Sequence, residues 1–237
     1  MEVESSAPPT AFKSTKILIT SQVIFVVASL AFVIASSLDY QENKKPEADQ
    51  SRSMSFVLLL IGGLGFLVMG ALDYYNTGDK LHILLFFAGG FSALSAMVSD
   101  KNVVAGIWLL LLASHLFILE SLRCIYGHLA YGTFMAQNDS RKTSLQFAEF
   151  GDVCFFLGAF LDVCCSYYLV AHTNKDTALV ATQTVTTSGV EIASSVFWLI
   201  ASGVALSVAI QTGKQGFANV SAVDGADAAK VPDGTMA

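Results

Sequence analysis

Charged residues are scarce in this chain. They make up 14% of its 237 residues, whereas soluble domains carry about 25%. Hydrophobic residues make up 54% of the sequence. A chain with so few charges cannot cover the surface of an ordinary soluble domain, and the composition therefore excludes that class.

Basic surface and binding motifs are missing as well. The net charge of −6 excludes a nucleic acid as the expected partner, because nucleic acid requires a basic face. The four cysteines form no CxxC pair, and no Cys/His cluster has zinc spacing. The chain also lacks GxGxxG, P-loop, HExxH and GxSxG motifs. The sequence predicts neither an enzyme nor a bound cofactor or metal.

Long apolar runs take the place of these features. Runs of about 18 to 22 residues, at 1.5 Å per residue, match a hydrocarbon core of about 30 Å. An open sheet would leave backbone groups unpaired in lipid, and the runs lack the alternation of barrel strands. We therefore predict an all-α, polytopic integral membrane protein, a bundle of about six transmembrane helices. The predicted spans are 17–38, 54–72, 81–98, 103–122, 146–171 and 192–210.

Polar tails flank the predicted bundle, residues 1–13 at the start and 211–237 at the end, and both are expected to be disordered. The first apolar run exceeds the apolar part of a cleaved signal peptide, about 7 to 15 residues, so we expect it to be retained. Lys and Arg number eight on the side of the two termini and five on the other, which predicts cytosolic termini. On this topology the glycosylation sequons at Asn138 and Asn219 face the cytosol and stay unmodified.

A sequence repeat links the first two runs. Residues 28–40 and 62–74 match at a fixed offset of 34 positions, and both copies end in Leu-Asp-Tyr. Small residues align with small residues, which predicts close helix packing. The predicted packing positions are Ala28, Ser29, Gly62, Gly63, Gly65 and Gly70. Either a duplication that relates the two spans as inverted copies or a shared packing solution explains the repeat.

Each copy of the repeat closes with an acid, Asp39 in the first and Asp73 in the second. A carboxylate at the C-terminal end of a helix opposes the helix dipole by a few tenths of a kcal/mol. Two interpretations follow. The acids are solvated charges at the two interfaces, or they contact ions or lipid headgroups there.

The fifth run carries three acids that the membrane cannot avoid, Glu149, Asp152 and Asp162. An aspartate at the centre of a span disfavours insertion by about 3 kcal/mol. This run therefore needs a polar partner within the bundle, and its acids are candidate functional residues.

His115, near the middle of the fourth run, is the expected partner of Asp162. A contact between them would relay protons or hold a cation, or it would only fix the register of two helices. Glu120 lies within reach of Arg123, three residues further on, and is expected to pair with it near the interface. Cys124 follows that arginine at the predicted cytosolic end, where it is either a palmitoylation site or a small packing residue.

Two functions are consistent with these patterns. The first is a structural, assembly or scaffolding component of a membrane, with the lipid bilayer, further copies or other membrane proteins as partners. It would act through the small-residue faces and through exposed tyrosines. The second is a small ion- or proton-coupled transporter or channel subunit, which would use His115 and Asp162 together with Glu120, Glu149 and Asp152.

Overall fold

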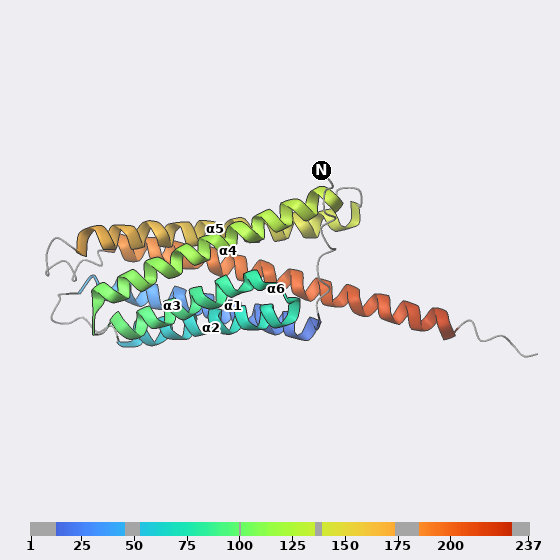
Figure 1. Ribbon diagram of the computed structural model, residues 1–237, viewed down its shortest axis with the longest axis horizontal. Coiled ribbons are helices and arrows are strands. Elements are labelled where there is room, and N and C mark those ends of the chain that lie inside the picture. Colours follow the sequence, from blue (N-terminus) through green and yellow to red (C-terminus); the bar gives the residue numbers. More distant parts are fainter. Residues whose placement is uncertain (1–12, 46–52, 100, 136–138, 174–184, 229–237) are drawn as a thin grey trace, which may run out of the picture.

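The chain folds into six long helices (Figure 1). The structure, a computed structural model, describes residues 13–45, 53–99, 101–135, 139–173 and 185–228. The helices are α1 (Thr15–Glu42), α2 (Ser53–Thr77), α3 (Ile83–Ser99), α4 (Val103–Met135), α5 (Asp139–Thr173) and α6 (Val185–Ala228), with a short 3-10 helix, η2 (Lys80–His82), before α3. All six contain a stretch long and apolar enough to cross a membrane. The predicted class, an all-α bundle of six membrane-spanning helices, is confirmed.

The helices form a closed ring. Each helix packs against the helices before and after it in the sequence, and α6 packs against α1. Consecutive helices run in opposite directions, as in other up-and-down bundles (Figure 1). We call the end of the ring at which α1 begins the N-terminal end, and the other the opposite end. Helices α2, α4 and α6 finish at the N-terminal end, where α3 and α5 begin.

Several helix ends lie beyond the predicted spans. Helix α4 continues to Met135, α5 starts at Asp139, and α6 continues to Ala228. The sequence fixes where apolar side chains stop, but the hydrogen-bond ladder of a helix can continue into water. No proline interrupts these segments, since the four prolines lie at positions 8, 9, 46 and 232. Residues 211–228 belong to α6, whereas 1–12 and 229–237 lie outside the described residues. The disorder expected of the two tails stays a prediction.

Six aromatic rings fill the middle of the helix ring. Their centroids lie 4.8 to 6.2 Å apart, mostly edge-to-face, the arrangement that aromatic side chains prefer. They come from five of the six helices and are all buried. We call this cluster the aromatic plug; it consists of Phe25, Phe32, Phe66, Phe117, Phe155 and Trp198.

Glycines of α2 allow α3 to approach closely. A Cβ atom on Gly63 would lie 2.5 Å from the backbone nitrogen of Ala93, and one on Gly70 would lie 2.5 Å from that of Phe86. Real Cβ atoms do not come so close to backbone atoms. The two helices therefore pack backbone against backbone, as small residues permit in membranes.

The same helix meets α1 through small residues. A Cβ atom on Gly65 would lie 2.7 Å from the Cβ of Ala28, and one on Gly62 would lie 2.7 Å from the ring of Phe32. Ala28 and Ser29 are buried in this contact region. The predicted packing positions are thus used between neighbouring helices of one chain.

The two acids of the repeat point into the ring, not to water. Asp39 and Asp73 are 4% and 7% exposed, which corrects the interpretation as solvated interfacial charges. Because α1 and α2 are antiparallel, the acids lie at opposite ends of the ring. The physical reason is helical spacing: the acid follows the buried positions of its helix at intervals of three and four residues. In α1 this buried face carries Ala28, Phe32, Ala35 and Asp39.

The α2–α3 contact yields a test of the packing. Gly63→Ala should destabilise the protein, because the added methyl group would overlap the backbone at Ala93. Overpacking typically costs about 1 to 3 kcal/mol and should lower the thermal unfolding temperature in detergent. Gly203→Ala is the control, because a Cβ there meets nothing within 4 Å. Equal unfolding temperatures for the two variants would contradict the close contact.

Candidate functional site: a chamber inside the ring

A cavity of about 300 Å³ lies inside the ring, between the aromatic plug and the N-terminal end. We call it the chamber. All six helices and η2 contribute to its wall. Much of the wall is apolar, and Phe25 and Phe155 of the plug form part of it. The polar side chains in the wall are those of Gln22, Asp73, Thr77, His82, Glu120, Arg123, Cys124 and Asp152.

A bidentate ion pair on α4 lies in the polar part of the chamber wall. The Arg123 Nε and Nη2 groups donate to Glu120 Oε2 and Oε1 over 2.9 and 2.5 Å. Glu120 is only 2% exposed, and a paired guanidinium is what such a buried carboxylate requires. The pair predicted from the three-residue spacing is confirmed.

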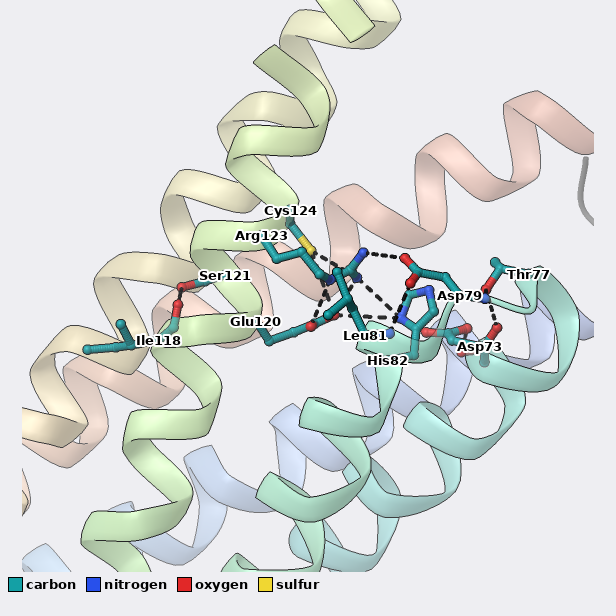
Figure 2. A network of polar contacts seen from close by, with 11 residues as sticks. Asp73, Thr77, Asp79, Leu81, His82, Ile118, Glu120, Ser121, Arg123 and Cys124 are labelled. Carbon is teal, nitrogen blue, oxygen red and sulfur yellow. Dashed lines mark hydrogen bonds and ion pairs between the residues drawn. The ribbon is translucent and has the colours of Figure 1, made fainter. Parts of the chain in front are cut away.

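The connection between α2 and α3 joins this pair (Figure 2). Arg123 Nη1 donates to Asp79 Oδ2 over 3.0 Å, and Arg123 Nη2 lies 3.3 Å from His82 Nδ1. His82 Nδ1 also lies 3.6 Å from Glu120 Oε1. The network therefore ties α4 to the α2–α3 connection across the ring.

The sequence at the end of α2 forms a turn that sets the position of the α2–α3 connection. Helix α2 ends at a glycine with φ of 73°, Gly78, whose N–H donates to the Tyr74 carbonyl over 2.8 Å. Glycine reaches this left-handed conformation without a steric cost and is the usual residue just after a helix. Asp79 then accepts from the Leu81 N–H over 2.9 Å, which starts η2. This turn brings both Asp79 and His82 beside Arg123 (Figure 2).

Asp73 is the acid of the α2 wall. Its Oδ1 accepts a hydrogen bond from Ser21 Oγ of α1 over 2.5 Å. At the opposite end, the repeat-related residues Asp39 and Ser55 are also buried. The repeat therefore places one buried acid at each end of the α1–α2 pair.

Gln22 lies next to Ser21 on α1 and also lines the chamber. Its side chain is 8% exposed, and its Oε1 accepts no hydrogen bond from the described residues. An unsatisfied buried carbonyl costs about 1 to 3 kcal/mol. Gln22 therefore presents an unused acceptor within the chamber.

Negative charge dominates the chamber. Four carboxylates, those of Asp73, Asp79, Glu120 and Asp152, belong to its wall or to the attached network. The one guanidinium among the described wall residues, that of Arg123, is bound to two of them. A low-dielectric wall strengthens the field of Asp73, which the Arg123 pairs do not include. The chamber is therefore suited to hydrogen-bond donors and positive charge.

His115 and Asp162 have different partners, which corrects the expected contact between them. His115 Nε2 lies 3.1 Å from the Tyr167 hydroxyl, and its Nδ1 lies 2.7 Å from the Leu111 carbonyl. Asp162 instead lies beside Ser194 of α6, whose hydroxyl donates to the Gly158 carbonyl over 2.9 Å. Asp162 and Tyr167 are five residues apart and so about 140° apart around α5. The face with Tyr167 meets α4, while Asp162 turns towards α6.

Of the other predicted residues, Glu120 and Asp152 meet in the chamber wall, whereas Glu149 does not line it. The Cys124 thiol also lines the chamber, 3.9 Å from Glu120 Oε1. It does not face the lipid, and this position gives no support to lipidation. The part of the chain that the structure describes contains no group of three or more His, Cys, Asp or Glu side chains that could hold a metal ion.

Sequence reasoning missed Gln22 and His82 and undervalued Asp73. A usable signal was present in the alternation of helix direction. In six antiparallel spans, the start of the first, the end of the second and the start of the third share one membrane face, and the end of the fourth joins them. All the polar residues of the chamber fall in those segments or near the start of the fifth predicted span, 146–171.

Comparisons with protein-family models, with curated protein sequences and with solved structures found no match to the chain.

The buried ion pair provides a second test. Arg123→Met should destabilise the protein by about 3 to 5 kcal/mol, because it leaves the carboxylate of Glu120 buried without its main partner. Adding Glu120→Gln should recover most of that loss in thermal or chemical unfolding.

The control for this test is Lys45→Met, which removes the exposed pair with Glu42. Exposed pairs contribute about 0 to 1 kcal/mol, so this variant should unfold close to the wild type. An Arg123→Met protein as stable as the Lys45→Met protein would show that the network does not hold the helices together.

Proposed function

We propose that this integral membrane protein binds a small amphiphilic molecule in the chamber. The observation that carries the proposal is a cavity of about 300 Å³ enclosed by all six helices. Ligand sites are typically clefts of about 300 to 1,000 Å³, mostly apolar, with a few polar groups that converge. The chamber has this character, because its apolar wall is interrupted by one cluster of buried polar groups.

The aromatic plug favours a binding site rather than an open pore. Its six rings fill the ring of helices and separate the chamber from the opposite end. A molecule therefore enters and leaves at the N-terminal end in this conformation. The Lys and Arg distribution favours a cytosolic N-terminal end, and the chamber then opens towards the cytosol. Release to the other side, as in a carrier, would require the plug to rearrange.

The scaffolding role is the second candidate function. The small-residue faces that favoured it are used within the ring, where Gly63 and Gly70 contact α3 and Gly65 contacts α1. Its remaining support is a set of exposed tyrosines, Tyr74, Tyr75, Tyr167 and Tyr168. Tyrosines of this kind are common at membrane interfaces in general. The proton-coupled alternative has less support, because His115 and Asp162 have separate partners.

Filling the chamber tests the proposed function. Ala205 of α6 lines the chamber, and Ala205→Phe should occupy its apolar part. We expect at least one of 4-phenylbutylamine, 4-phenylbutanol and 4-phenylbutyrate to raise the unfolding temperature of the wild type. The same compound should leave Ala205→Phe unaffected, because no room remains for it.

The matched control is Ala71→Phe, an equal change at an exposed position of α2. It should respond as the wild type does, which separates binding in the chamber from partition of the compounds into detergent. If none of the three compounds acts, or if Ala205→Phe responds like the wild type, the chamber is not a binding site.

A further inference from the structure

We infer that the ligand of the chamber is an organic cation, an ammonium group on an apolar body, and that Asp73 and Gln22 bind its charged end. This inference rests on the proposed function and deepens it by naming the class of ligand. It follows from three features of the chamber: an unused acceptor, a buried acid in the same wall, and no available permanent positive charge among the wall residues that the structure describes.

The unused acceptor is Gln22 Oε1. It is buried in the chamber wall and receives no hydrogen bond from the described residues. A carbonyl oxygen can only accept, so the group that satisfies it must bring an N–H or O–H. An ammonium group brings three such donors. A carboxylate ligand would leave this oxygen unsatisfied.

The buried acid is Asp73, which also lines the chamber. It accepts from Ser21 Oγ over 2.5 Å, and Ser21 precedes Gln22 in α1. The two acceptors thus come from adjacent helices that this hydrogen bond holds together. An ammonium group has enough N–H groups to donate to both the carboxylate and the amide oxygen. Charge-assisted hydrogen bonds of this type are stronger than neutral ones.

The described wall of the chamber offers no free permanent positive charge to an anionic ligand. Among the wall residues that the structure describes, Arg123 carries the permanent positive charge, and both Glu120 and Asp79 already bind it. An anionic ligand would have to break these bonds or lie beside Asp73. A cation instead offsets the excess of negative charge.

The apolar body of the ligand has a wall to contact. Phe25, Met69, Phe155 and Val204 contribute apolar side chains to the chamber wall. Water is the alternative occupant, since about 300 Å³ would hold about ten molecules at about 30 Å³ each. If water is the natural occupant, an amine and an alcohol of the same shape should bind with the same affinity.

The repeat provides a matched control at the opposite end of the ring. Asp39 is the counterpart of Asp73 and is similarly buried. The counterpart of Gln22 at the same offset is Phe56, which cannot accept a hydrogen bond. The inferred subsite therefore exists at one end only, and Asp39→Asn removes a comparable buried acid outside the chamber.

Titration of the purified full chain in lipid nanodiscs at pH 7 tests the inference. 4-Phenylbutylamine should bind the wild type about tenfold or more tightly than 4-phenylbutanol, because only the amine forms charge-assisted hydrogen bonds. 4-Phenylbutyrate should bind most weakly. Asp73→Asn keeps the shape of the side chain and an acceptor for Ser21, and it should bring amine and alcohol to equal affinity.

Two further variants keep the test decisive. Gln22→Leu should weaken the amine by more than the alcohol, and Asp39→Asn should retain the full preference for the amine. Equal affinity for amine and alcohol in the wild type, with binding still lost in Ala205→Phe, would overturn the cation and leave the chamber as a site. Loss of the preference in Asp39→Asn as well would also overturn it, because the effect would then not belong to the chamber. Absence of binding by all three compounds would overturn both proposals.

Discussion

Hydrocarbon offers no partner to a polar side chain, so every acid within a span of this protein needs one inside the bundle. Because α6 packs against α1, the six helices close into a ring with an interior shielded from lipid. Asp73 accepts from Ser21 of the adjacent helix, and Glu120 is held by Arg123 on its own helix. An open row of six helices would expose some of these groups to lipid. The acids can therefore be buried only because the six helices close into a ring.

The interior divides into parts with different physical roles. Edge-to-face aromatic rings pack the middle at short range and exclude water. Towards the N-terminal end the packing gives way to the chamber, where small side chains such as Ala201, Ala205 and Ala209 of α6 leave space. A rigid plug below a polar cavity favours capture of a molecule from one face.

Much of the fold could be predicted from the sequence, because hydrophobic length alone identifies a span. The Glu120–Arg123 pair was also predictable, since three residues bring two side chains together on any helix. The partners of His115 and Asp162 were not, because they depend on how far each helix is rotated, and one residue changes that rotation by about 100°. The helical extensions at Met135 and Ala228 escaped for another reason. Polar residues there mark the end of lipid contact, and helices can continue past it.

Closure of the ring is tested most directly by a cross-link between its first and last helices. The Oγ atoms of Ser36 and Ser195 lie 3.3 Å apart, joining α1 to α6. Cysteines at these two positions, in a chain whose four native cysteines are replaced by alanine, lie close enough for a disulfide. Mild oxidation in native membranes should form an intramolecular cross-link in most molecules. Single-cysteine variants should form none. Absence of the cross-link, with both thiols still reactive towards a small alkylating reagent, would contradict a closed ring and with it the enclosed chamber.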